Sequence, residues 1–257
     1  MALVERRDVG AVAVVEMNRP ERRNALAGAL VEALASTLGA AAEDDAVNAI
    51  VLTGRGTVFC AGGDLAEGLA GDGFVASHDQ RGQYADLLAL IPRLRVPVVA
   101  AVNGDALGGG LGLAAACDVV VADARARLGT PEVRVGLFPW IILAVLQRDV
   151  PRKPLMELVL TGGRWSAEEA QQLGLVNRVA EEGTAVDTAV ALATVIAARS
   201  PAVIAWGKAA FYRISDQGYD DALAYMHAQL SLNLLTEDAM EGVAAFLQKR
   251  EPRWTGR

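Results

Sequence analysis

Two glycine-rich turns are the part of this sequence best suited to chemistry. The first is the segment 59–65, FCAGGDL, and the second is the segment 103–110, NGDALGGG, between a predicted strand and an apolar helix. Glycine allows unusual backbone angles and lets the backbone approach a ligand closely. Two such turns could direct two backbone N–H groups at one oxygen, forming an oxyanion hole. Simple tight turns between strand and helix are an equally good interpretation of the spacing alone.

A carboxylate in an apolar stretch of sequence is the second chemical feature. Glu132 lies between Pro131 and Val133 in the segment 129–140, GTPEVRVGLFPW. Burial among apolar groups raises the pKa of a carboxyl group, which suits it to carry protons near neutral pH. An ordinary surface glutamate is the alternative that this local pattern leaves open.

A dinucleotide-binding fingerprint is also formally present. The segment 110–115, GLGLAA, has the form G-x-G-x-x-A, and Glu132 follows roughly 20 residues later. The residues from Gly104 to Gly109 separate this motif from its strand, whereas the fingerprint begins where the strand ends. We therefore discount it, although a nucleotide-dependent oxidoreductase remains a hypothesis that NAD binding would test.

Metal and disulfide chemistry find no support in the sequence. His78 and His227 are isolated, and Cys60 and Cys117 lack the spacing of a metal site or a typical bridge. We predict no metal ligands and no cofactor other than what the substrate itself carries.

Composition restricts the class of protein further. The chain has 257 residues, of which 53% are hydrophobic and 21% charged, and its net charge of −7 disfavours non-specific binding to nucleic acid. No apolar run reaches the ~18 residues of a membrane span, and the start of the chain lacks the apolar core of a signal peptide. These observations predict a cytoplasmic protein with no membrane partner.

The elements that must position these residues alternate between strands and helices up to about residue 195. The segments 4–7 and 11–17 predict a hairpin, and further strands are expected at 49–53, 58–61, 96–102, 119–122 and 177–179. We expect Asn24 to cap a helix that ends at Gly39 and carries Leu26, Leu30, Leu34 and Leu38 as one apolar stripe.

Helix signals continue to the end of the chain. Ser166 and Glu169 form a capping box, and Pro201 begins a helix. The segment 220–235 is amphipathic, and from about residue 184 only helices are expected. We therefore predict an α/β body over residues 1–195 and a helical C-terminal region over residues 196–257.

Taken in order, the motifs resemble the enoyl-CoA hydratase/isomerase (crotonase) superfamily over nearly the whole chain. Each motif alone is weak, but the ordered set is highly specific. The resemblance rests on the segments 18–20 (NRP), 24–26 (NAL), 59–65 (FCAGGDL), 97–104 (PVVAAVNG), 106–110 (ALGGG), 116–118 (ACD), 131–133 (PEV), 160–162 (LTG) and 174–177 (GLVN).

The resemblance implies a crotonase-like α/β fold, a spiral of ββα units with a helical C-terminal trimerisation region. It implies that the amides of Gly63 and Gly109 polarise a thioester carbonyl and that Glu132 exchanges a proton with substrate carbon. The coenzyme A part of the substrate would run along Ala61, Gly62, Asp64 and Leu65. Phe246 and Lys249 would reach the coenzyme A bound to a neighbouring subunit in a homotrimer or dimer of trimers.

The chain departs from the hydratases at one important position. The second glutamate of those enzymes falls at Gly112, and the segment 139–142, PWII, replaces a glycine-rich stretch. Trp140 and Ile141 are candidates for the wall of an acyl pocket, as well as for ordinary core packing. Hydration in the well-known members uses two carboxylates, whereas a 1,3 proton shift needs only one base.

These considerations predict an enoyl-CoA hydratase-like enzyme with Glu132 as its acid/base. Two alternatives stay open, a Δ3,Δ2-enoyl-CoA isomerase that uses Glu132 alone and a non-catalytic acyl-CoA-binding relative. Asp64, Glu67 and Asp105 are candidates for an assisting acid.

Overall fold

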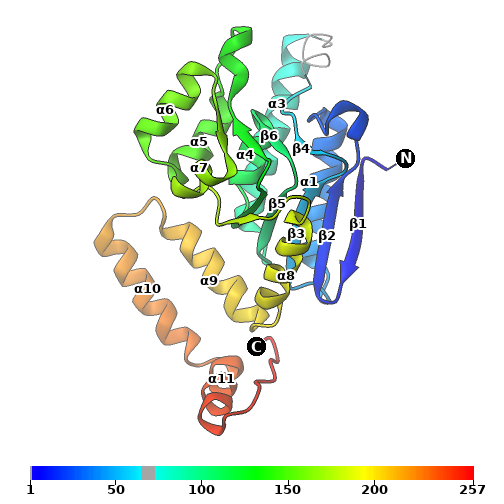
Figure 1. The fold of residues 1–257 in the computed structure, drawn as a ribbon. Helices are drawn as coiled ribbons and strands as arrows, with labels where there is room; N and C mark the ends of the chain where they lie inside the picture. The colour runs from blue at the N-terminus through cyan, green and yellow to red at the C-terminus, as the bar shows by residue number, and fades with distance from the viewer. Residues whose placement is uncertain (1, 65–72) are drawn as a thin grey trace.

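A six-stranded sheet forms the centre of the protein, and the computed structural model describes it within residues 2–64 and 73–257 (Figure 1). The predicted hairpin pairs β1 (Val4–Val9) with β2 (Val12–Met17) in antiparallel register. The remaining strands are parallel, and the order is β1-β2-β3-β5-β7-β10. They are β3 (Ala49–Gly54), β5 (Val98–Val102), β7 (Val119–Asp123) and β10 (Arg178–Ala180). The central strands β3 and β5 are buried along their whole length, as expected for a parallel sheet covered on both faces.

A second, four-stranded sheet was not anticipated as a sheet from the sequence. Its order is β4-β6-β8-β9, and only β9 is antiparallel to its neighbour. The strands are β4 (Val58–Cys60), β6 (Asp105–Leu107), β8 (Arg127–Gly129) and β9 (Arg164–Ser166). Each has three residues, too few for a clear period-two pattern, and only β4 falls within a strand expected from the sequence, at 58–61.

Three helices follow the ββ pairs and complete the repeating units. Helix α1 spans Gly28–Glu43, α3 spans Phe74–Leu90, and α4 spans Gly109–Ala115. The predicted start and end of α1 were wrong, because its N-cap is Ala27 and Gly39 lies inside the helix. Leu30, Leu34 and Leu38 nevertheless form the expected stripe and are fully buried.

Shorter helices lie near the second sheet, where α7 packs against β8 and β9 and α5 packs against α4. Helix α5 spans Trp140–Asp149, α6 spans Arg152–Thr161, and α7 spans Ala167–Gln172. The capping box at α7 is confirmed, since the Ser166 side chain accepts from the Glu169 amide and the Glu169 side chain accepts from the Ser166 amide. Single 3-10 turns lie at Pro20–Arg22, Ile91–Arg93 and Pro131–Val135.

The last four helices divide between the body and an extension. Helix α8 (Ala185–Ala197) packs on the outer face of the large sheet through its small residues Ala185, Ala189 and Ala193. Helix α9 (Pro201–Ile214) begins a helical extension and contacts the body at the turn Ile91–Arg93, whereas α10 (Tyr219–Asn233) and α11 (Glu237–Gln248) extend away from it (Figure 1).

Large apolar side chains remain exposed along this helical extension. They include Phe211, Leu223, Leu230, Leu234, Val243 and Phe246. Within the described part of the chain, no single helix is long and apolar enough to cross a membrane, although the bent pair α8 and α9 passes by length and composition.

Candidate functional site

Three neighbouring strands of the second sheet bring the predicted site residues to one edge. Strands β4, β6 and β8 are adjacent and parallel, so their carboxyl ends meet at the same side of the sheet. Gly63 follows β4, Gly109 follows β6, and Glu132 follows β8. Residues separated by up to about 70 positions in sequence therefore lie together because adjacent strands are only about 4.8 Å apart.

The two glycine turns touch each other. A methyl group built on Gly62 would lie 2.9 Å from the Leu107 carbonyl oxygen and 3.5 Å from the Gly109 nitrogen, and the φ of Gly62 is +98°. A methyl group on Gly110 would lie only 2.3 Å from the Cys60 carbonyl oxygen. Close backbone approach is thus the physical reason for glycine at these positions.

The amides of Gly63 and Gly109 are both available to a ligand. The Leu26 amide donates to the Gly62 carbonyl at 2.8 Å, and the Asp64 amide donates to the Leu26 carbonyl at 3.2 Å, which leaves the Gly63 N–H on the opposite side of the chain. Gly109 is the first residue of α4, so its N–H has no acceptor within the helix. Among the described residues, neither amide donates to a protein acceptor. Two free donors on touching turns can hold an oxygen that gains negative charge.

Glu132 lies beside these turns with an unsatisfied carboxylate. A methyl group on Gly108 would lie 2.7 Å from Glu132 Oε1, so the carboxylate rests against the glycine that precedes Gly109. Glu132 Oε2 is buried and has no hydrogen-bond partner in the described residues. Burial raises the pKa of Glu132, and its own backbone amide opposes this effect. Such a carboxyl group can exchange protons with a ligand held at the turns.

Gly112, one turn into α4, faces the side chains of Ile142, which lies in the segment 139–142 noted in the sequence, and of Tyr84, which sequence reasoning missed. A methyl group on Gly112 would lie 2.2 Å from Ile142 Cγ2 and 2.8 Å from the Tyr84 hydroxyl oxygen. The Tyr84 hydroxyl donates to the Gly109 carbonyl at 2.5 Å. No local signal marks Tyr84, because it belongs to α3 and only the tertiary packing brings it to α4 beside Ile142 of α5.

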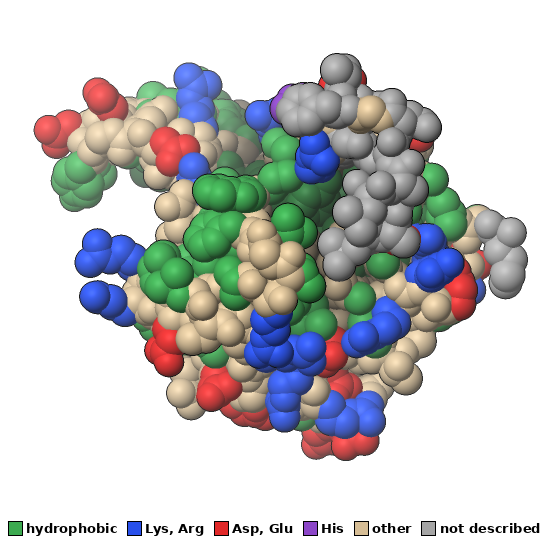
Figure 2. Space-filling model, turned by 90° about the horizontal axis from the view of Figure 1, so that it is seen from above, with side chains coloured by type: hydrophobic (Ala, Val, Ile, Leu, Met, Phe, Trp, Pro, Cys, Tyr) green, Lys and Arg blue, Asp and Glu red, His purple; other side chains and the backbone are tan. Residues whose placement is uncertain are grey.

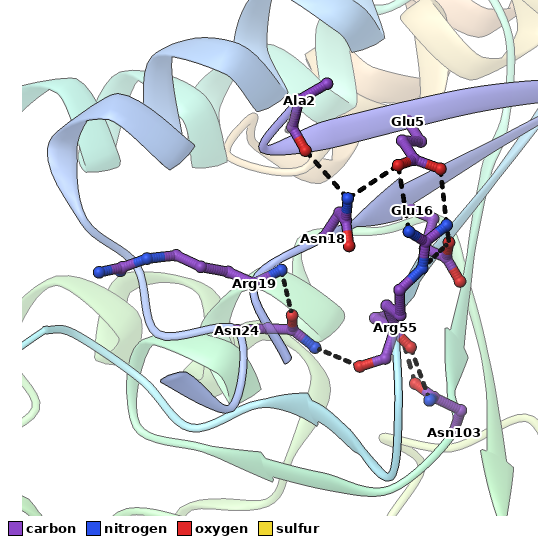
Figure 3. A network of polar contacts seen from close by, with 9 residues as sticks. Ala2, Glu5, Glu16, Asn18, Arg19, Asn24, Arg55 and Asn103 are labelled. Atoms are coloured by element: carbon purple, nitrogen blue, oxygen red, sulfur yellow. Dashed lines mark hydrogen bonds and ion pairs between the residues drawn. The ribbon is translucent and has the colours of Figure 1, made fainter. Parts of the chain in front are cut away.

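A buried polar network holds the turn that leads into Leu26 (Figure 3). The Asn24 side chain accepts from the Arg19 amide at 3.0 Å and donates to the Arg55 and Val58 carbonyls at 3.0 and 2.8 Å. Asn24 is fully buried and has a φ of +54°. The Asn24 side chain therefore links the turn to the β3–β4 connection and holds Leu26, whose backbone pairs with that of Gly63. It does not cap a helix, as the sequence had suggested.

Other predicted acids are paired with arginines. Asp64 lies 3.0 Å from Arg19 Nη1, and Asp105 lies 3.5 Å from Arg23 and 3.7 Å from Arg164. These ion pairs favour a structural role for both carboxylates. Glu67 and Leu65 lie outside the described residues.

The predicted pocket residues differ in their surroundings. Trp140 is 76% exposed and its ring lies 4.9 Å from that of Phe138, whereas Ile141 packs partly against the core. The Ala61 amide donates to the Arg23 carbonyl at 3.0 Å, next to the Gly62 turn.

Phe246 and Lys249 belong to the far end of the helical extension. Phe246 is 82% exposed, and Lys249 ends α11 with a φ of +53°. Figure 1 shows α11 well away from α4 and β6.

Comparisons with known proteins identify the family to which the sequence is similar. The sequence model described as enoyl-CoA hydratase/isomerase matches residues 7–257. A putative enoyl-CoA hydratase of Thermus thermophilus is 40% identical over 95% of this chain and 98% of its own, and the 2,3-dehydroadipyl-CoA hydratase of Escherichia coli is 38% identical over 96% of each. The rat protein named enoyl-CoA hydratase domain-containing protein 3, mitochondrial, is 37% identical over 94% of this chain and 80% of its own.

Solved structures confirm the predicted fold. The enoyl-CoA hydratase of Mycobacterium smegmatis superposes with a TM-score of 0.94 at 38% identity, covering 98% of each chain. Human enoyl coenzyme A hydratase domain-containing protein 3 superposes with a TM-score of 0.94 at 33% identity, covering 98% of this chain and 100% of its own.

Proposed function

This chain belongs to the enoyl-CoA hydratase/isomerase family, and on that premise we propose that it binds an acyl-CoA thioester and stabilises its enolate. The Gly63 and Gly109 amides donate to the thioester oxygen, and Glu132 is the acid/base. Two fixed donors stabilise the negative charge that develops on this oxygen in the transition state by several kcal/mol. Removal of one such donor from an enzyme typically raises the barrier by about 3–4 kcal/mol. The free amides and the raised pKa of Glu132 support these roles.

The reaction that the geometry supports best is the shift of a double bond from C3 to C2. Glu132 removes a proton from C2, the electrons move into the enolate, and the protonated Glu132 returns a proton to C4. One carboxyl group carries both transfers, so atoms and charge balance without a second acid. The observation that carries this choice is the space at Gly112, which Ile142 and Tyr84 fill.

Hydration is the second candidate, because several relatives are named hydratases. It requires a water molecule activated by a group other than a carboxylate at position 112. Loss of a general base typically lowers a rate by 10²–10⁴-fold. A purely binding role gives no reason for the buried Oε2 atom of Glu132, which has no hydrogen-bond partner among the described residues and is therefore costly to stability.

The coenzyme A part of the substrate extends along Ala61, Gly62, Asp64 and Leu65 in this proposal. Figure 2 shows hydrophobic side chains gathered in a hollow of one face, with Lys and Arg side chains grouped beside it. An acyl-CoA carries an apolar chain and phosphates, and this distribution is compatible with both. No cofactor beyond the substrate is needed.

Assembly and location remain predictions. The exposed apolar residues of α9 to α11 support a homotrimer or a dimer of trimers, in which Phe246 and Lys249 reach a neighbour's coenzyme A. The cytoplasmic location is likewise a prediction.

The proposed reaction is tested by spectroscopy with two substrates. The protein is incubated with 3-hexenoyl-CoA and the conjugated enoyl-thioester absorbance is followed, and then with crotonyl-CoA to follow loss of that absorbance. We expect conjugation that depends on Glu132 and little hydration. Hydration faster than conjugation would make the second candidate correct, and inactivity on both with retained acyl-CoA binding would favour a binding role.

A further inference from the structure

We infer that Tyr84 and Ile142 determine the reaction of this site, because together they fill the space of a second acid and Tyr84 holds the Gly109 peptide in place. The inference rests on the proposed function, since it specifies why one carboxylate acts alone. Ile142 is a specificity-determining residue in this account, and Tyr84 is a positioning residue.

Ile142 is the stronger obstacle to a side chain at position 112. It lies in the first turn of α5, is 3% exposed, and packs against α4. A methyl group on Gly112 would lie 2.2 Å from its Cγ2 atom and 2.8 Å from its Cβ atom. The Cβ of Ile142 cannot move by a change of rotamer, so the clash requires a shift of α4 against α5. A glutamate at position 112 therefore does not fit beside Ile142.

Tyr84 completes the closure from the other side. Its hydroxyl oxygen would lie 2.8 Å from a methyl group on Gly112 and 3.5 Å from one on Gly109. The hydroxyl donates to the Gly109 carbonyl, and this bond ties α3 to the first residue of α4. Since the Gly109 amide is a proposed oxyanion donor, the bond restrains the residue that carries the donor.

The Tyr84 hydroxyl is also a poor replacement for the missing acid. Burial raises its pKa well above the usual value, and Cys60 and Glu132 add to the effect, so the phenol stays neutral. Its proton is engaged by the Gly109 carbonyl. Glu132 touches Gly108 and Tyr84 touches Gly109, so one carboxylate and one neutral hydroxyl line successive residues of the turn.

Melting temperatures test first whether Ile142 occupies the space beside Gly112, and they require no measurement of activity. Gly112→Ala should lower the melting temperature, and Ile142→Ala in the same chain should recover a large part of that loss. Gly39→Ala is the matched control, because Gly39 is also inside a helix and a methyl group there meets nothing within 4 Å. Strictly additive effects of Gly112→Ala and Ile142→Ala would overturn the claim.

The claim about reaction is tested by introducing the second acid. Gly112→Glu in a Tyr84→Phe/Ile142→Ala background should gain hydration of crotonyl-CoA at least tenfold above that background, whereas Gly112→Gln should not. Gly112→Glu alone should lose stability and gain no hydration. The inference fails if Gly112→Glu alone folds normally and hydrates, or if the triple variant melts like its background and shows no gain.

Tyr84→Phe alone provides a variant that is expected to fold. It should lower kcat for the double-bond shift about tenfold, with KM for the acyl-CoA within about twofold, because the hydroxyl acts through the oxyanion donor. An unchanged kcat would overturn the positioning role. If the wild-type protein shifts no double bond, the proposed function fails, while the stability test still decides whether Ile142 occupies the space at position 112.

Discussion

The carboxylate of Glu132 rests directly against the α-carbon of Gly108, where a methyl group would lie 2.7 Å from Oε1. The same glycine has a φ of +52°, which disfavours any L side chain. Gly108→Ala should therefore displace Glu132 and strain the turn that carries the Gly109 amide. We expect kcat to fall about 10²-fold, the size of effect that a misplacement of roughly 1 Å can cause.

A matched control separates displacement from general strain. Gly10 has a φ of +59° in the β1–β2 hairpin, and a methyl group there meets nothing within 4 Å. Gly10→Ala should lower stability modestly and leave kcat unchanged. Equal loss of kcat in both variants would argue that Gly108 does not act through Glu132.

The pH dependence of the reaction should report Glu132. As a base, Glu132 must be deprotonated in the free enzyme, and burial raises its pKa above the ordinary value of 4.5. The kcat/KM should therefore fall as pH decreases through a value above 4.5. Glu132→Gln should lower kcat by about 10²–10⁴-fold and remove this acidic limb, so a retained limb would assign it to another group.

Glu132 should also reduce the stability of the protein at neutral pH. Its folded pKa is raised, so it contributes favourably below its unfolded pKa, and this contribution is lost as pH rises through the folded pKa. Glu132→Gln should melt at a higher temperature than the wild type at pH 7.5, and the difference should disappear near pH 4.

Glu168, on the surface, is the control for this prediction and gives the opposite expectation. The pKa of the exposed Glu168 carboxyl is lowered by its own backbone amide and then by the Ser166 side chain. Glu168→Gln should thus not raise the melting temperature at pH 7.5. Stabilisation by both substitutions would point to the net charge of the chain instead of to the burial of Glu132.

The packing of α9 against the body should depend on the buried ion pair between Lys208 and Asp118. Lys208 of α9 is 7% exposed and donates to Asp118 Oδ2 at 2.7 Å and to the Ile91 and Val96 carbonyls at 3.1 and 3.0 Å. Lys208→Met leaves the Asp118 carboxylate without its cation and should cost about 3–5 kcal/mol of unfolding free energy.

The exposed pair between Arg148 and Asp216 is the comparison for that experiment. Its two side chains are 52% and 75% exposed and lie 3.0 Å apart. Arg148→Met should cost below about 1 kcal/mol, as most surface pairs do. Chemical denaturation of both variants measures the difference, and similar costs would exclude a special role for Lys208.

The sequence predicted those elements whose signals are local. The Ser166 capping box and the hairpin before Met17 depend on neighbouring residues, and both are confirmed. The strand expected at 96–102 is also confirmed, although it begins two residues later, at Val98. The error at Asn24 has a physical cause, since asparagine also tolerates a positive φ and can bond across a loop as well as cap a helix.

Tyr84 and Ile142 could not have been predicted in the same way. Tyr84 lies in an ordinary helical stretch, and Ile142 is one apolar residue among several in α5. Their importance comes from the distance between three helices at Gly112, which no local pattern encodes. In the second sheet, β4 lies within the strand expected at 58–61, whereas β6, β8 and β9 escaped for a similar reason, because three residues pair there through tertiary context.

The central claim, that two amides and Glu132 generate an enolate, is tested most directly by hydrogen exchange at C2 of a saturated acyl-CoA in D₂O. Butanoyl-CoA can neither shift a double bond nor take up water, so mass spectrometry of its deuterium content reports proton removal alone. We predict exchange with the wild-type protein and at least 10²-fold slower exchange with Glu132→Gln. Exchange at the same rate in both proteins, or none with the wild type despite bound butanoyl-CoA, would contradict the account.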